Sequence, residues 1–240
     1  MSKTIAIFGF GPGLGMGTAR VFGREGFRVA VVGRRPDKAE LHVKDLRAEG
    51  IEAAAFPTDV TDAAQVRDTV SAIRARFGEI DVAVHGAAGN IGDRIPSTLD
   101  LDVAGLSVPM ALKLHSPILM TRALAPAMIA RGEGTLLFSS GSTPRAPWPH
   151  LSNFGVALAA QHGYVQQLAA ELSGTGVYAG VLNIGVLIGN SVAEELIDNN
   201  PELVPEGLDI VRMSNNELGE HYWRMYVERD SASVDVGFPE

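Results

Sequence analysis

Five glycines near the start of the chain form its clearest candidate binding motif. They occupy every second position of IFGFGPGLGMGTA, directly after a short apolar run. The spacing Gly-x-x-x-Gly-x-Gly fits this stretch in two registers, and we prefer the one that starts at Gly9, because Gly9 follows the apolar run. Glycines between a strand and a helix let the backbone approach a pyrophosphate at the amino terminus of the helix. We therefore expect Gly9, Gly13, Leu14 and Gly15 to bind a nucleotide; the alternative is a flexible turn without a ligand.

Short apolar runs and longer helical patterns alternate along the chain and would position this loop. The runs are apolar on both faces, as in buried parallel strands; they are Thr4–Phe8, Arg28–Val32, Glu52–Phe56, Ile80–His85, Thr135–Ser139 and Val177–Ile184. The helical segments are Gly15–Glu25, Asp37–Ala48, Ala63–Phe77, Val108–Ala130 and Phe154–Leu172. This alternation predicts an α/β fold, a Rossmann-like doubly wound parallel sheet with helices on both faces. Ligands of such sheets bind beyond the carboxyl ends of the strands.

Composition limits the classes of function. With 240 residues, 46% of them hydrophobic, and no linker, we expect one domain over residues 1–240. Twenty Lys and Arg against 28 Asp and Glu argue against nucleic-acid binding. The absence of Cys excludes disulfides and thiolate metal sites, and the His and carboxylate residues show no metal-ligand spacing. No apolar run approaches the ~18 residues of a membrane span, and no signal peptide is evident, so we expect a cytoplasmic protein.

Several stretches resemble the short-chain dehydrogenase/reductase family. GLGMGTARVFGREGFRVAVVGRR resembles the first strand–helix–strand unit of that family. TDVTD and DVAVHGAA lie where the family has its adenine-contacting Asp and its Asn-Asn-Ala-Gly strand end, and the segment Phe154–Leu172 parallels its active-site helix. The resemblance extends over roughly residues 4–190. It implies about seven strands, a nicotinamide cofactor and a small-molecule substrate.

The resemblance also implies which residues line the cofactor site. Asp59 and Val60 would line the adenine pocket, and Gly86 and Ala87 would lie near a ribose. Gly185, at the end of the sixth strand, matches a family glycine near the nicotinamide, although Ile184 replaces the family's Pro. His85 takes the place of the first Asn, where we expect a hydrogen-bonded structural residue.

The residues after the second strand indicate which nicotinamide cofactor is bound. NAD-using members of the family usually have an acidic residue where this chain has Gly33. Arg34 and Arg35 follow, and guanidinium groups form forked, charge-assisted hydrogen bonds with a 2′-phosphate. The alternative is two solvated arginines at the start of a helix, where positive charge is mildly unfavourable. We therefore expect NADP(H).

The catalytic tetrad of the family is matched only in part. Ser140 matches the family's Ser, but Phe154 and Leu158 stand where the family has the proton-donating Tyr and the Lys that lowers its pKa. Lys113 occupies the family's Asn position. This chain therefore has an ammonium at residue 113, whereas the family has one at the position of Leu158. The alternative is a helix residue with a solvated tip. We take Ser140 and Lys113 as the candidate catalytic residues.

Few other polar side chains are expected near the site. His150 lies in a Pro-rich loop and is a weaker candidate for an acid. His162 and Tyr164 lie further along the helical segment Phe154–Leu172, where we expect them to be too far from the site.

We also expect an oligomer interface and a lid region near the C-terminus. Family members pair through the active-site helix and the helix before it, so we expect a homodimer or homotetramer. About residues 186–232 would form a substrate lid and a C-terminal helix with Leu218, Tyr222, Met225 and Tyr226 on one face, before a seventh strand at Ser233–Val236.

Three functions remain open at this point. The first is an NADP(H)-dependent oxidoreductase that reduces a small carbonyl or similar unsaturated substrate with an unusual proton supply. The second is a protein that binds NADP(H) without redox turnover, as a sensor or partner subunit. The third is a lyase or isomerase on the same frame, because a fold does not fix a function.

Overall fold

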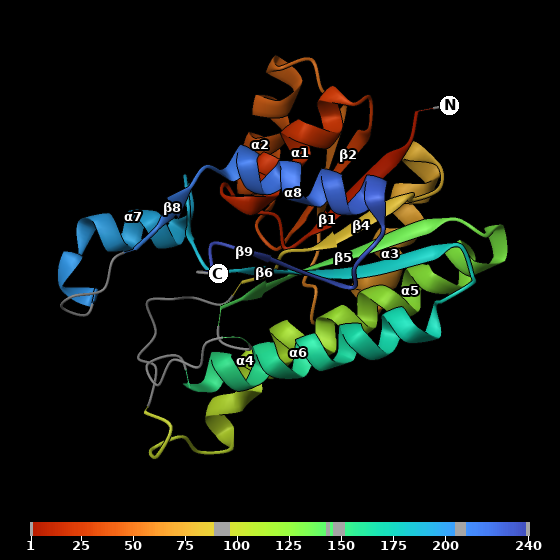
Figure 1. Ribbon diagram of the computed structural model, residues 1–240. Helices are drawn as coiled ribbons and strands as arrows, with labels where there is room; N and C mark the ends of the chain where they lie inside the picture. The colour runs from red at the N-terminus through yellow and green to blue at the C-terminus, as the bar shows by residue number, and fades with distance from the viewer. Residues whose placement is uncertain (1, 89–96, 143–144, 146–151, 205–209, 239–240) are drawn as a thin grey trace.

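The computed structural model describes residues 2–88, 97–142, 145, 152–204 and 210–238. Its centre is a sheet of seven parallel strands in the order β3-β2-β1-β4-β5-β6-β9 (Figure 1). The strands are β1 (Thr4–Phe8), β2 (Arg28–Gly33), β3 (Ala53–Pro57), β4 (Val82–His85), β5 (Gly134–Gly141), β6 (Val177–Ile184) and β9 (Ser233–Val236). The order reverses at β1, and this confirms the predicted doubly wound sheet.

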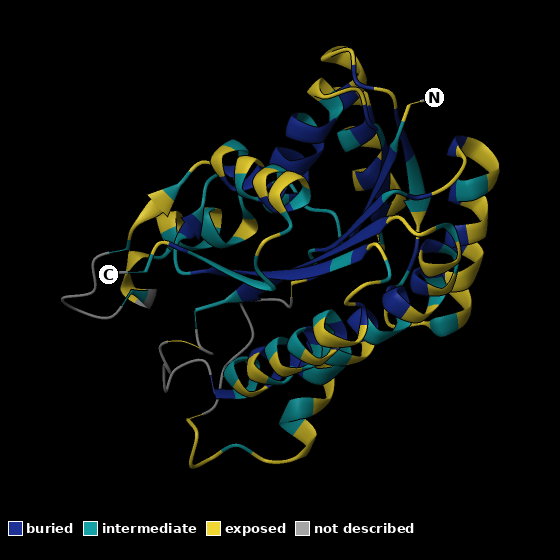
Figure 2. Cartoon of the chain, turned by 45° about the vertical axis from the view of Figure 1, so that its right-hand side comes forward, coloured by how far each residue is buried: buried dark blue, intermediate teal, exposed yellow. Residues whose placement is uncertain are grey.

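Helices cover both faces of this sheet. One layer contains α1 (Leu14–Arg24), α2 (Pro36–Ala48) and α8 (Asn215–Glu228). The other contains α3 (Ala63–Phe77), α5 (Ser116–Arg131) and α6 (Ser152–Glu171). Figure 2 shows the buried strands between helices whose outer faces are exposed. The apolar pattern on both sides of each strand therefore reflects burial from both sides.

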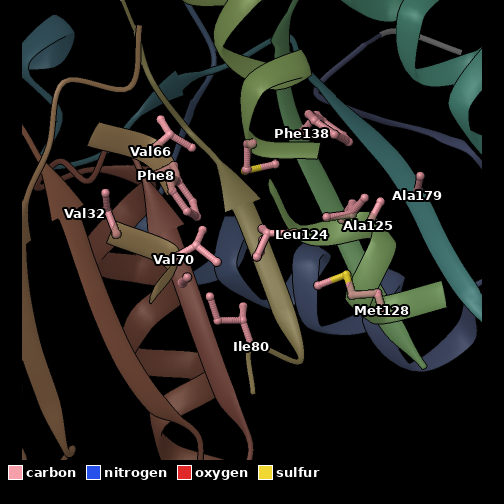
Figure 3. Packing of buried hydrophobic residues seen from close by; sticks show 14 of the residues in the cluster. Phe8, Val32, Val66, Val70, Ile80, Leu124, Ala125, Met128, Phe138 and Ala179 are labelled. Carbon is pink, nitrogen blue, oxygen red and sulfur yellow. The ribbon is translucent and has the colours of Figure 1, made fainter. Parts of the chain in front are cut away.

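Each face of the sheet carries its own hydrophobic core. Along β1, Ile5 and Ile7 pack toward α1, α2 and α8, whereas Ala6 and Phe8 pack toward α3 and α5. Figure 3 shows Phe8 in the second of these cores, with Leu124 of α5 in the same cluster. This two-residue alternation is the geometry of an extended strand.

The prediction of one continuous helix over residues 108–130 is wrong. The structure divides it into α4 (Ser107–Met110), a π-helical stretch (Ala111–His115) and α5, after a short 3₁₀ helix at Ala104–Leu106. Pro117 has no N–H to donate to the carbonyl of Lys113, and the Ser116 hydroxyl donates to the carbonyl of Leu112 over 2.8 Å. The regular hydrogen-bond ladder is therefore interrupted in this turn.

The region predicted as a lid contains small elements that the sequence pattern did not reveal. They are β7 (Leu187–Ile188), α7 (Val192–Asn199), a 3₁₀ helix at Pro201–Leu203 and β8 (Arg212–Met213). β7 and β8 pair in a separate two-stranded sheet. Figure 1 shows α7 and β8 at the side of the main sheet.

The predicted C-terminal helix is present as α8. Leu218, Tyr222 and Met225 are buried, and Tyr226 packs against the same core. α8 lies so close to α1 that a Cβ at Gly17 would overlap the backbone oxygen of Asn215. Among the described helices, none combines the length and hydropathy needed to span a membrane.

Candidate functional site

A pocket of about 820 Å³ opens at the carboxyl ends of β1, β2, β4, β5 and β6. Its volume lies within the usual range for a small-molecule site. The walls come from the loops that follow strands of the main sheet, from α2, the π-helical stretch and α6, and from the segment that leads into α7. Of the residues predicted to form the site, twelve line this pocket, namely Gly9, Gly13, Leu14, Gly15, Gly33, Arg34, Arg35, Val60, Gly86, Ala87, Lys113 and Ser140.

The glycine loop forms the floor of one end of the pocket. Gly9 has φ +78°, and a Cβ there would overlap the backbone of Ala87, so only glycine fits this position. At Gly13 a Cβ would come within 2.8 Å of the Ser191 side chain, whereas at Gly11 it would meet nothing within 4 Å. This geometry fits the register that begins at Gly9.

The start of α1 is suited to a negatively charged ligand. Its N-cap, Gly13, contributes no side-chain hydrogen bond, and the first turn contains no acidic residue. The partial positive charge at the amino terminus of the helix is thus not balanced by an acidic residue of its own first turn. A phosphate group fits such a position.

A second positively charged region lies at the end of β2. Arg34, Arg35 and Lys38 are exposed on the pocket wall, and none of them forms an ion pair with a described residue. His42 lies one turn beyond Lys38, with its ring 5.2 Å from that of Phe10. Burial is the main cause that lowers the pKa of His42. Sequence reasoning missed Lys38 and His42, although their four-residue spacing on a helix indicated a shared face.

Asp59 does not belong to the described wall of the pocket, although its neighbours Thr58 and Val60 do. Its carboxylate accepts hydrogen bonds from the backbone N–H and the hydroxyl of Thr61, over 2.9 and 2.7 Å. These bonds, mainly the one from the hydroxyl, lower the pKa of Asp59. Its contact with an adenine therefore stays a prediction.

The other end of the pocket brings Lys113 and Ser140 to one wall. Lys113 lies in the π-helical stretch, and its side chain is only 7% exposed. Burial lowers the pKa of this ammonium from 10.5 to about 8. Ser140 is buried as well, and its hydroxyl has no hydrogen-bond partner among the described residues. Lysine and serine thus face a shared space, as a site for proton transfer requires.

α6 closes this end of the pocket with an apolar surface. Leu158 is buried and forms part of the pocket wall, 3.1 Å from where a Cβ at Gly141 would lie. Phe154 is half-buried one turn earlier, outside the described wall. Neither side chain can donate a proton.

His85 lies behind the pocket and is fully buried at the end of β4. Its Nε2 lies 2.7 Å from the hydroxyl oxygen of Ser116. That hydroxyl already donates to the carbonyl of Leu112, so Nε2 must carry the hydrogen of the His85 ring. Burial, and then the positive charge of Lys113, lowers the pKa of His85 to about 3. A neutral, hydrogen-bonded histidine agrees with the expected structural role.

The remaining candidates lie away from the pocket or outside the described residues. Gly185 donates its backbone N–H to Val236 over 2.8 Å, and only its neighbours Ile184 and Val186 reach the pocket wall. His162 lies 3.3 Å from the Asn183 side chain, and neither it nor Tyr164 lines the pocket. His150 falls outside the described residues. Within the described ranges, no group of three or more His, Asp and Glu side chains is arranged to hold a metal ion.

Comparison with known proteins agrees with this architecture. A model of the short chain dehydrogenase family matches residues 3–200. A short chain dehydrogenase of Pseudocercospora fijiensis is 30% identical over 184 residues, which are 76% of this chain and 59% of that protein. The chain therefore spans about three fifths of the length of this relative.

Two solved structures share the fold over almost the whole chain. L-Sorbose reductase from Gluconobacter frateurii, solved with NADPH and L-sorbose, has a TM-score of 0.83 and 22% identity, with 98% of this chain and 95% of that chain covered. Actinorhodin polyketide ketoreductase, solved with NADPH, has a TM-score of 0.86 and 21% identity over the same shares. Likeness at this identity shows the fold, and the family model spans more than three quarters of the sequence. The chain belongs to the short-chain dehydrogenase family.

Proposed function

We propose that this protein is an NADP(H)-dependent oxidoreductase that reduces a small carbonyl or similar unsaturated substrate without the family's Tyr and Lys. The observation that carries the proposal is the division of one pocket into two functional ends. One end has the glycine loop and cations that form no ion pair with a described residue, and the other has Lys113 and Ser140. The whole of residues 1–240 would serve this single site, with residues 186–232 as a lid and C-terminal helix, in a homo-oligomer.

The described residues fit a dinucleotide that carries a 2′-phosphate. The glycine loop and the start of α1 would hold the pyrophosphate, and Arg34, Arg35 and Lys38 would hold the 2′-phosphate. When bound, the nicotinamide would supply or accept a hydride. The chain itself would orient the substrate, exclude water and move a proton.

Lys113 would provide that proton. Its lowered pKa, about 8, keeps the ammonium mostly protonated near neutral pH and yet able to release a proton to a developing alkoxide. Ser140 would donate a hydrogen bond to the same substrate oxygen, because its hydroxyl has no partner among the described residues. Phe154 and Leu158 would contribute apolar surface that keeps water out.

We expect NADPH to bind at least ten times more tightly than NADH, because only NADPH has a phosphate for Arg34 and Arg35. A tenfold preference corresponds to about 1.4 kcal/mol, a modest value for a phosphate held by arginine. Calorimetric titration of both cofactors checks it. In the Arg34→Ala/Arg35→Ala variant the preference should disappear, whereas Arg24→Ala, an exposed arginine of α1 outside the pocket, should retain it. Equal affinities in the unmodified protein would contradict the assignment of these arginines.

The Phe154→Tyr/Leu158→Lys double variant should gain reductase activity toward generic ketones, and each single variant should gain little. The phenol and the ammonium act as a unit, since the lysine makes the tyrosine a better acid. NADPH oxidation with a small set of neutral ketones measures the effect. If the double variant gains nothing over the single ones, the shape of the pocket rather than the missing pair limits the reaction.

Binding without turnover is the second candidate function. It is favoured by the apolar wall that Leu158 forms beside Ser140, where the family has its lysine. Under this alternative NADPH would bind, with the arginine-dependent preference, and no carbonyl compound would oxidise it.

A further inference from the structure

The buried ammonium of Lys113 has no counter-charge among the described residues. Its side chain forms no ion pair or hydrogen bond with them, although it is only 7% exposed. An unpaired charge in an apolar setting carries a large desolvation cost. The charge is therefore expected to have a partner that enters the pocket from outside the protein.

The described wall of the pocket contains no Asp or Glu. Its ionisable side chains are Arg34, Arg35, Lys38, His42 and Lys113. The first four lie together at the end of β2 and on α2, at the end assigned to the 2′-phosphate. Lys113 lies at the other end, where Leu112 and Leu158 also line the pocket. A ligand group that neutralises Lys113 is thus distinct from the 2′-phosphate of the dinucleotide.

The polar atoms beside Lys113 suit a small anion. The ammonium offers three hydrogen-bond donors, and the Ser140 hydroxyl, which lines the same pocket, offers a fourth that is unused among the described residues. A carboxylate has two oxygens that accept several such bonds. The nearby His85 is neutral and gives Lys113 no counter-charge. The charge of Lys113 contributes to the lowered pKa of His85.

We propose that the substrate carries a carboxylate next to its reacting carbonyl, and that Lys113 binds this carboxylate while Ser140 donates a hydrogen bond to the carbonyl oxygen. The substrate class is then a 2-oxo acid, or a 2-hydroxy acid in the reverse direction. The inference rests on the proposed function, because it names the substrate class of that same site. The carboxylate and the carbonyl of such a substrate are directly bonded, so an ammonium that binds the carboxylate would also lie close to the carbonyl oxygen and could serve both binding and proton transfer.

The test is calorimetric titration with oxamate, a stable analogue of a 2-oxo acid, into protein saturated with NADP⁺. Ethyl oxamate, which lacks the negative charge, is the matched uncharged probe. We expect oxamate to bind at least ten times more tightly than ethyl oxamate at about pH 7. This preference reports on the anion alone and requires no turnover.

Proton uptake provides a second readout. Free Lys113, with a pKa of about 8, is mostly neutral at about pH 9, and an anion binds its protonated form. Oxamate binding at that pH should take up about 0.9 proton per anion and be about tenfold weaker than at neutral pH. At about pH 6.5 the uptake should be close to zero. His85, with a pKa of about 3, does not contribute in this range.

Variants assign the effect to Lys113. Lys113→Met should lose oxamate binding at least tenfold together with the proton uptake, and Lys113→Arg should bind oxamate without uptake, because arginine stays protonated. Lys44→Met, an exposed lysine of α2 outside the pocket, should match the unmodified protein. Circular dichroism establishes that each variant is folded.

Three outcomes would overturn the inference. They are equal binding of oxamate and ethyl oxamate, unchanged oxamate binding in folded Lys113→Met, and oxamate binding that NADP⁺ abolishes. The last would mean that the cofactor itself neutralises Lys113. NADP⁺ binding is measured first on the same sample, so a failure of the proposed function appears there and is separate from these outcomes.

Discussion

Lys113→Met is expected to reduce kcat at least about 100-fold, because a positioned general acid contributes about 10²–10⁴ in rate. Methionine preserves the length and packing of the lysine stem but cannot donate a proton or bind an anion. Lys113→Arg keeps the positive charge and should be almost as inactive, since its guanidinium does not release a proton. NADPH oxidation with the best substrate from a panel of 2-oxo acids and neutral ketones measures both. Activity that survives in Lys113→Met would show that another group supplies the proton.

Lys113→Met should also change how the stability of the folded protein depends on pH. The folded protein lowers the pKa of Lys113 from 10.5 to about 8, so the unfolded chain binds this proton more tightly. The stability of the unmodified protein should therefore increase from about pH 8 to pH 10.5, and Lys113→Met should lack this increment. At neutral pH the variant should be at least as stable as the original, because a buried charge is removed. Thermal unfolding across this pH range, with Lys44→Met as control, tests the sign. A clear loss of stability at neutral pH would contradict the burial of an uncompensated charge.

Gly9→Ala is expected to cost about 2–5 kcal/mol of stability and to abolish NADPH binding. Two independent effects contribute, since a non-glycine residue at φ +78° is strained and the new Cβ would overlap the backbone of Ala87. Relief of the overlap would move the loop away from the position in which its N–H groups face a phosphate. Chemical denaturation and NADPH titration measure the two consequences.

Gly11→Ala is the matched control within the same loop. A Cβ at Gly11 would meet nothing within 4 Å, and its φ is not positive. We expect it to change stability by less than about 1 kcal/mol and to leave NADPH bound. If both alanine variants bind NADPH equally well, Gly9 is not required for the loop geometry.

Much of the fold could be predicted from the sequence, because strands that are buried on both faces have a strong apolar pattern. β1, β6 and β9 begin and end at the predicted residues, and the bounds of the other four main-sheet strands differ by one or two residues. Parallel neighbouring strands need a crossover connection, which is usually a helix. The alternation of strand and helix therefore predicted that the strands are parallel. The predicted seventh strand is also present, as β9.

The parts that the sequence did not reveal depend on local or long-range details. The π-helical stretch arises from Pro117 and from the Ser116 hydroxyl bond, whereas the apolar pattern continues through it. β7 and β8 have two residues each, too few for an alternation to appear. Their pairing joins segments more than twenty positions apart in the chain, which periodicity does not detect.

The candidate site could be predicted where one strand end determines a residue's place. Gly9, Gly33 and Gly86 directly end or follow strands, Ser140 is the last residue but one of β5, and all four line the pocket. Lys38 was missed because its position depends on how α2 rotates on the sheet. Asp59 was expected in the wall, but its side chain turns toward Thr61.

Loss of nicotinamide absorbance on mixing the protein, NADPH and a panel of 2-oxo acids and neutral ketones tests most directly whether the protein is an oxidoreductase. We expect at least one 2-oxo acid to oxidise bound NADPH, with one 2-hydroxy acid formed per NADPH consumed, and neutral ketones of the same size to react more slowly. NADPH that binds tightly and is oxidised by none of these compounds would contradict the assignment as an oxidoreductase.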